Sequence, residues 1–214
     1  MATSSSKTSP VRRRRYRSEL REHQADQTAR AVIEAARDLF VAKGWAGTGM
    51  REVASTAGVA TETVYSRFSS KLGLLRAVID FAVVGDDAPE RLAQRPEFQE
   101  MGVGSRSERV AAGARMLTQV QQRTAPIAKL LRDGARADDA IAEMLDATRE
   151  RQRLDVAAAF ELIVGRPPTA VERDGWWAIV SPEIYLLLVE ESGWTPEEYE
   201  AWIAVTSERV LPVS

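Results

Sequence analysis

Apolar residues recur every three or four positions over most of this chain, a spacing that predicts helices. The first clear case runs from Gln27 to Lys43 and stops at Gly44, a residue type that favours helix ends. Helical spacing returns in residues 106–122, 126–131, 138–164 and 169–180, and again after Ser181 and Thr195. No segment alternates apolar and polar residues with β-branched enrichment, so a sheet is not expected. We therefore predict an all-α fold of about ten helices, with residues 86–104 forming mainly a loop.

Residues 48–71 predict two short helices joined by a tight turn, with a further helix beginning after the serine pair at 69–70. Gly58 interrupts the apolar pattern at the point where the turn needs a residue that tolerates positive φ. The second short helix buries little, and its remaining side chains form an outward polar face. This is the arrangement of a DNA-reading helix-turn-helix.

The same segment resembles the tetracycline-repressor (TetR) family of bacterial transcription regulators, from about Thr28 to Ile79. The matching positions keep the family's spacing throughout and are Leu39-Phe40, Gly44-Trp45, Val53-Ala54, Ala57-Gly58-Val59, Thr63-Val64-Tyr65, Phe68, Ser70-Lys71 and Leu74-Leu75. The resemblance implies an N-terminal three-helix DNA-binding domain and a C-terminal helical bundle for ligand binding and dimerisation. We place a basic disordered arm at residues 1–23, the DNA-binding domain at 24–70 and the bundle at 71–214.

The resemblance also implies roles for single residues. Positions that contact DNA phosphates in the family correspond to Thr48, Thr63, Tyr65 and Lys71, whose hydroxyl and ammonium groups can donate to phosphate oxygens. Positions that point into the major groove correspond to Ala60, Thr61, Glu62, Ser66 and Arg67. The alternative for the first group is that Thr63 caps its helix locally and Tyr65 packs against the protein.

Two positions depart from the family pattern. Gly49 stands where the family usually has a Ser or Thr that caps the first short helix, so we expect that cap to be missing. Glu62 replaces a common glycine and places a negative charge near DNA, which should favour specificity at a cost in affinity.

A cluster of five arginines lies well before the first predicted apolar helix, namely Arg12, Arg13, Arg14, Arg15 and Arg17. They form either a solvated tail that binds DNA without sequence preference or an arm that enters the minor groove. Both alternatives raise the affinity for DNA and its dependence on salt.

The net charge of −2 conceals a strong asymmetry along the chain. Residues 1–80 carry 14 Lys and Arg against 8 Asp and Glu, a net charge of +6, which leaves −8 for residues 81–214. A basic N-terminal part on an acidic body fits a protein that binds DNA at one end.

Composition argues against catalysis and against membrane insertion. The chain has no Cys and one His, His23 in a polar region, so we expect no catalytic residues, no metal site and no cofactor. No apolar run reaches about 18 residues, and no apolar segment follows the basic N-terminus. We expect a cytoplasmic protein with no membrane partner.

Polar residues interrupt the apolar lines of the later helices at Gln121, Thr148 and Gln152. Either these lines turn towards solvent, or the polar groups orient a small-molecule effector inside an apolar cavity. For the dimer, a C-terminal interface is expected at the apolar residues Ile184, Leu187, Leu188, Trp194 and Trp202.

Together these features predict a ligand-responsive transcriptional regulator, a repressor that binds a palindromic double-stranded DNA operator as a homodimer. The alternative is a helical small-molecule-binding protein whose helix-turn-helix no longer reads a specific operator.

Overall fold

The computed structural model describes residues 10–85 and 92–212, with side chains from residue 23, and within them all regular structure is helical. The all-α prediction is therefore confirmed. The N-terminal helices are α1 (Pro10–Gly47), α2 (Met50–Thr56), α3 (Thr61–Phe68) and α4 (Lys71–Val84). The later helices are α5 (Pro96–Gln99), α6 (Arg106–Gly134), α7 (Asp139–Val164), α8 (Ala170–Ile179), α9 (Pro182–Tyr185) and α10 (Pro196–Val210). Two 3-10 turns (Leu92–Gln94 and Glu100–Gly102) flank α5, and a π-helical segment (Leu186–Glu191) follows α9.

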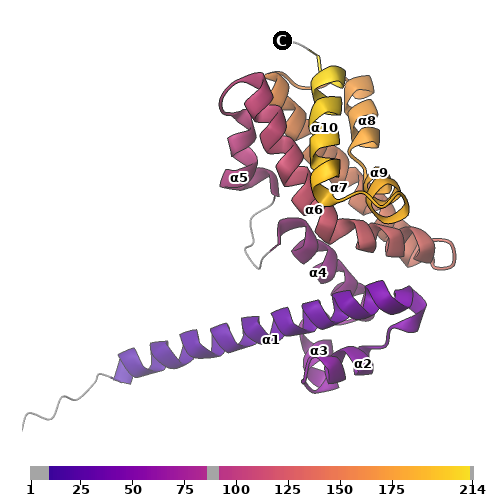
Figure 1. Cartoon of the computed structure of the whole chain (residues 1–214). Helices are drawn as coiled ribbons and strands as arrows, with labels where there is room; N and C mark the ends of the chain where they lie inside the picture. The colour runs from indigo at the N-terminus through magenta and orange to yellow at the C-terminus, as the bar shows by residue number, and fades with distance from the viewer. Residues whose placement is uncertain (1–9, 86–91, 213–214) are drawn as a thin grey trace, which may run out of the picture.

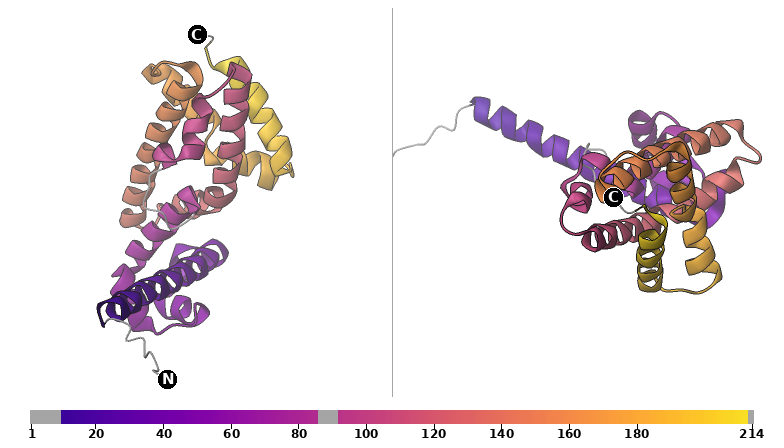
Figure 2. Two further views of the ribbon diagram at one scale, coloured as in Figure 1. Left: turned by 90° about the vertical axis from the view of Figure 1, so that its left-hand side faces the viewer. Right: turned by 90° about the horizontal axis from the view of Figure 1, so that it is seen from above.

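The helices separate into a DNA-binding end and a body. In Figure 1, α1 crosses beneath the body, with α2 and α3 on its far side, while α4 rises from this group towards α6. The left view of Figure 2 agrees, because the N-terminal helices lie at one end and the C-terminus at the other. A single hydrophobic core joins the two parts, since it combines residues of α1–α4 with Ile127 and Leu131 of α6 and Ile141 of α7. A second core fills the body.

The first helix begins at Pro10, whereas the sequence predicted a start near Gln27 behind a disordered arm. Residues 10–26 consist mainly of good helix formers such as Arg, Glu, Leu, Gln and Ala, and proline is well placed in a first helical turn. Our prediction missed this extension because it relied on apolar spacing, which that stretch lacks. Residues 1–9 lie outside the described residues. At the other end Gly44 leaves the helical conformation (φ 71°), as its expected role in ending the helix requires.

Helix α6 runs unbroken from Arg106 to Gly134, whereas the sequence predicted two helices separated before Pro126. Proline inside a helix removes one hydrogen bond and strains the preceding turn. Here the flanking Ala125 and Ile127 are buried, one in each core, so tertiary packing offsets that cost. The predicted loop at 86–104 was also wrong in its described part, where the short helical turns bury Phe98 and Met101.

Several helix starts follow the expected capping chemistry. The Ser70 hydroxyl accepts a hydrogen bond from the Gly73 amide (3.0 Å) at the start of α4, and Thr169 and Thr195 form capping boxes at α8 and α10. Ser181 precedes α9 but makes no side-chain cap.

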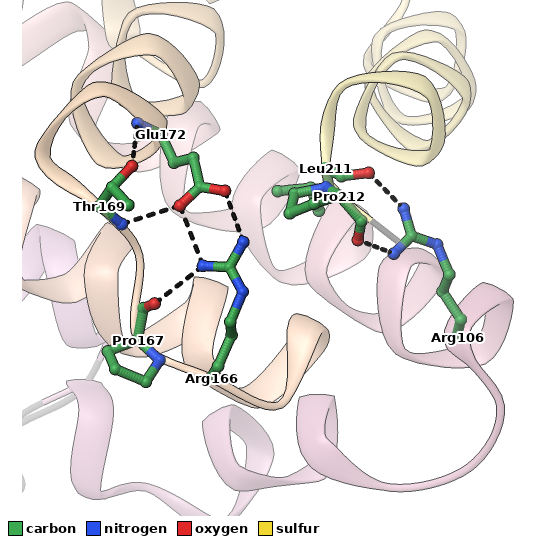
Figure 3. A network of polar contacts seen from close by, with 7 residues as sticks. All are labelled: Arg106, Arg166, Pro167, Thr169, Glu172, Leu211 and Pro212. Carbon is green, nitrogen blue, oxygen red and sulfur yellow. Dashed lines mark hydrogen bonds and ion pairs between the residues drawn. The ribbon is translucent and has the colours of Figure 1, made fainter. Parts of the chain in front are cut away.

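Arginines fix the ends of two body helices, as Figure 3 shows. Arg106 at the start of α6 donates to the carbonyl oxygens of Leu211 (2.7 Å) and Pro212 (2.6 Å) after α10. Arg166 donates to both carboxylate oxygens of Glu172 (2.6 and 3.0 Å). This hydrogen bonding, helped by the Thr169 amide, lowers the pKa of Glu172 to about 2. Among the described residues, no helix is both long and apolar enough to cross a bilayer.

Candidate functional site

Helices α2 and α3 with the turn between them, here called the recognition unit, are held against α1 by a few small contacts. Val53 and Ala54 of α2 and Val64 of α3 are each at most 1% exposed, and they share the core with α1 and α4. Between them Gly58 adopts a positive φ of 69°, and the Val59 amide bonds the Ala54 carbonyl (2.9 Å). The predicted turn at Gly58 is thus found. Because only Val64 of α3 is fully buried, the rest of that helix is left largely on the surface.

The outward face of α3 carries the side chains that were expected to contact DNA. Thr61 is partly buried, whereas the exposed members are Ala60, Glu62, Thr63, Tyr65, Ser66 and Arg67. The Tyr65 side chain does not pack into the core, since it is 48% exposed, and α3 has no side-chain cap, so Thr63 does not serve as one. Both elements of the local alternative are therefore wrong.

Two residues of this face already have partners within the protein. The Ser66 hydroxyl donates to the Thr63 carbonyl (3.0 Å). The Arg67 guanidinium lies 3.5 Å from the Asp26 carboxylate, and both side chains are more than half exposed. Such an exposed ion pair contributes little and can be exchanged for a contact with DNA.

Thr48 does not belong to the exposed face. It is 3% exposed, and its hydroxyl donates to the carbonyl oxygens of Leu39 (3.1 Å) and Gly44 (3.0 Å), which completes the end of α1. The expected phosphate contact is therefore replaced by a structural role, because the unpaired carbonyls at a helix end need donors. The neighbouring Gly49 begins α2 without a side-chain cap, as its departure from the family pattern predicts.

Lys71 lies in a network that joins the DNA-binding end to the body. Its ammonium group donates to the Trp45 carbonyl and lies 4.2 Å from the centroid of the Trp45 ring. The Trp45 indole in turn donates to the Asp138 carboxylate (2.7 Å), which also caps α7. Burial lowers the pKa of Lys71, against the effect of Asp138, and the Trp45 hydrogen bond lowers the pKa of Asp138. In this conformation Lys71 therefore serves the network and not a phosphate.

The side chains of the five predicted arm residues, Arg12 to Arg15 and Arg17, lie outside the described part of the chain. Their backbone continues α1, whose N-terminal half projects beyond the rest of the molecule in Figure 1.

The body contains a cavity of about 130 Å³ lined mainly by α6 and α7, with further residues from α8 and α10. Gln121 and Gln152 line it, as the ligand-pocket hypothesis requires, but Thr148 does not belong to its wall. Instead the Thr148 hydroxyl donates to the Met144 carbonyl of its own helix (2.8 Å). Most other lining residues are apolar, and Trp176 and Trp177 of α8, which the sequence did not single out for this role, also line it.

The five predicted interface residues differ in exposure. Leu187 is 47% exposed, whereas Ile184, Leu188, Trp194 and Trp202 are partly buried. The rings of Trp194 and Trp202 meet edge to face with 6.1 Å between centroids. Part of the apolar surface that the sequence assigned to a partner is thus packed within the protomer itself.

The arrangement of α1–α4 and the polar face of α3 define a helix-turn-helix DNA-binding protein. Residues 32–78 match the family described as bacterial regulatory proteins, tetR family. Residues 32–78 are therefore similar to the DNA-binding domain of that family.

Two transcriptional regulators are similar to this chain over short segments. The HTH-type transcriptional regulator AlkX of Mycobacterium tuberculosis is 34% identical over 74 residues, which cover 35% of this chain and 33% of that protein. The HTH-type transcriptional regulator SrpR of Pseudomonas putida is 38% identical over 56 residues, 26% of each chain. The matches therefore span about a third and a quarter of the two relatives.

Solved structures resemble the whole fold. A transcriptional regulator from Rhodococcus sp. Rha1 superimposes with a TM-score of 0.61 at 19% identity, covering 86% of this chain and 95% of that one. A tetR-family transcriptional regulator from Streptomyces coelicolor gives 0.58 at 19% identity, covering 86% and 80%. At 19% identity the likeness concerns the fold alone. Because 86% of this chain is covered, it includes the body as well as the DNA-binding end.

Proposed function

We propose that this protein is a repressor that binds a palindromic operator as a homodimer and releases it when a small molecule enters the body. The observation that carries the proposal is the outward face of α3, which presents Glu62, Thr63, Tyr65, Ser66 and Arg67 to the surface on a helix fixed through Val64. Short polar groups and an arginine on such a helix suit phosphate and base contacts. The net charge of +6 in residues 1–80 adds attraction to DNA. Because the protein would act on DNA, we place it in the cytoplasm.

Within this proposal, Thr63 and Tyr65 contact phosphates and set the register of α3 in the groove. Ala60, Thr61, Glu62, Ser66 and Arg67 face the base edges, with Arg67 able to form a fork onto guanine once it leaves Asp26. Two such units, one per protomer, would read the two half-sites.

The proposed response to an effector is supported by contacts that connect the cavity with the DNA-binding end. Val83 of α4 lines the cavity, and Arg123 of α6 donates to the carbonyl oxygens of Ala82 (2.8 Å) and Val83 (3.3 Å). A ligand that displaces α6 would therefore displace α4, which shares its core with α1 and α3.

A titration of the full-length protein on its own upstream DNA and on random DNA, at several salt concentrations, tests the proposal. A regulator should keep a preference of about 10³-fold or more for its operator at physiological salt. The runner-up function is a small-molecule-binding protein that no longer reads an operator. It predicts equal affinities for both DNAs with the same steep dependence on salt.

Tyr65→Phe should weaken binding to operator and random DNA alike by about 1 kcal/mol, because it removes one phosphate hydrogen bond and nothing else. Folding should not change, since the ring is 48% exposed. Fluorescence anisotropy on both DNAs measures the effect. A changed base preference at unchanged non-specific affinity would instead make Tyr65 a base-reading residue.

Glu62→Gly should raise affinity for random DNA and relax discrimination at one base pair per half-site by about 1–3 kcal/mol, if the carboxylate accepts from a cytosine amino group. Glu62→Gln is the matched control, because it removes the charge at nearly constant size. Binding to a set of single-base operator variants resolves the two effects. An equal gain on every variant would mean that Glu62 only repels phosphate.

A further inference from the structure

One hydrogen-bond donor at the wall of the body cavity has no acceptor. The indole Nε1 of Trp177 is completely buried and makes no hydrogen bond, although the residue lines the cavity. The Arg153 guanidinium lies over the Trp177 ring, 4.2 Å from its centroid. Buried polar groups in proteins are nearly always paired, so an unpaired donor beside an empty space indicates a missing acceptor.

Three other polar groups of the wall are already satisfied within the protein. Gln121 donates to the Val180 carbonyl (2.7 Å), Thr124 donates to the Val120 carbonyl (2.9 Å), and the Ser207 hydroxyl accepts from the Trp176 indole (3.4 Å). These groups have no need of a ligand, whereas the Trp177 N–H does. Gln152 and Ser181 also line the cavity, but among the described wall residues only Trp177 has a buried side-chain polar atom without a partner. An acceptor atom placed opposite Trp177 would therefore orient a ligand.

The charge of the wall limits the ligand further. Among the described residues that line the cavity there is no Lys, Arg or His, and the one acidic residue, Asp155, has an interaction partner in the protein. An anion would enter an apolar space without a cation to pair with, which is strongly unfavourable. The wall thus favours a neutral molecule.

The size of the cavity limits the ligand as well. Its volume of about 130 Å³ is close to that of an engineered apolar cavity of about 150 Å³ that binds benzene. Phe98, Trp176 and Trp177 supply aromatic surface at the wall, and side chains such as Leu117, Val156 and Ile163 supply aliphatic surface.

We propose that the effector of this protein is a neutral, mainly apolar molecule of about one aromatic ring, with a single oxygen or nitrogen acceptor that receives the Trp177 indole N–H. This inference rests on the proposed function, because it names the ligand class for the effector cavity. Trp177 is the residue that sets the specificity for an acceptor-bearing molecule.

The test compares three probes of similar size on the full-length protein without DNA. Acetophenone carries the acceptor, isopropylbenzene is its counterpart without an acceptor, and benzoate is the anionic control. Calorimetry gives the affinities, and the indole region of a ¹H–¹⁵N spectrum follows the N–H groups of the five tryptophans. The Trp177 signal is identified as the one missing from Trp177→Phe, a variant that keeps an aromatic ring beneath Arg153.

We expect acetophenone to bind about 5- to 10-fold more tightly than isopropylbenzene, the gain of one net hydrogen bond, and to shift the Trp177 N–H signal. Trp177→Phe should remove this difference while isopropylbenzene still binds, which shows that the cavity is intact. Ala159→Phe, which places a ring in the cavity, should abolish binding of both.

Equal binding of acetophenone and isopropylbenzene, a preference for benzoate, or an unmoved Trp177 signal would overturn the inference. A gel shift with operator DNA then separates it from the proposed function. Operator binding that acetophenone fails to release, although the compound binds through Trp177, would contradict the effector response and leave the ligand class standing.

Discussion

Leu187→Glu is expected to convert the protein into monomers and to abolish specific operator binding while the helix content persists. Leu187 lies in the π-helical segment after α9 and exposes 47% of its surface, the largest exposure among the five predicted interface residues. In a symmetric dimer each copy of the substitution would bury a carboxylate without a partner, which is strongly unfavourable. Without the dimer a single recognition helix faces each half-site, and the affinity that comes from binding two half-sites together is lost.

The exposure of Leu187 also makes this experiment decisive, because a half-exposed side chain can be replaced by a charge without unfolding the protomer. Leu154→Glu is the matched control, since Leu154 is 62% exposed on α7, outside the predicted interface, and should leave the dimer unchanged. Sedimentation or size-exclusion with light scattering gives the mass, circular dichroism the helix content, and a gel shift the operator binding. A Leu187→Glu protein that remains dimeric and binds normally would place the interface elsewhere.

The recognition unit could be predicted from the sequence because it depends on local rules. Helical spacing places α2 and α3, Gly58 supplies the positive φ of the turn, and Ser70 caps the next helix. Each of these features acts over a few residues, so its signal is contained in a short window of sequence. The exposed face of α3 follows from the same spacing.

The roles of Thr48 and Lys71 could not be predicted in this way. The Lys71 network depends on a hydrogen bond between Trp45 and Asp138, which are 93 residues apart. The sequence pattern predicted that Asp138 begins a helix, and Asp138 does cap α7. The pattern did not indicate that the second carboxylate oxygen of Asp138 accepts from the Trp45 indole. Thr48 illustrates the same limit at short range, because a residue type suited to phosphate is equally suited to the carbonyls at a helix end.

The body shows how packing overrides local signals. Pro126 marks a helix break in the sequence, yet α6 passes through it because the residues around it are buried in both cores. Of the three polar positions proposed for a ligand pocket, Gln121 and Gln152 lie at the cavity wall and Thr148 does not. The unpaired indole of Trp177 has no sequence signature at all, since whether a donor is satisfied depends on every neighbour that the fold brings to it.

Deletion of residues 1–17 is expected to have the other large effect, a marked decrease in DNA affinity together with a weaker dependence on salt. The deletion removes Lys7 and the five arginines Arg12 to Arg15 and Arg17. Each DNA phosphate that these side chains no longer neutralise should reduce the slope of log affinity against log salt by about 0.9, so that six such phosphates per protomer would reduce it by about 5. The fold should persist, because the described cores begin beyond this segment, at Ala29.

A second variant distinguishes the effect of losing the positive charge from the effect of losing the helical segment itself. Replacing the five arginines with glutamine, a good helix former, keeps the extension of α1 while removing its charge, and it should reproduce most of the change in slope. Anisotropy titrations between low and physiological salt, on operator and random DNA, measure both variants. A decrease in affinity that is equal on both DNAs indicates a solvated basic segment, whereas a greater decrease on operators with A·T-rich flanks indicates entry into the narrow minor groove. An unchanged slope on both DNAs would show that these arginines do not contact DNA, and the basic charge that attracts it would then have to lie beyond residue 17.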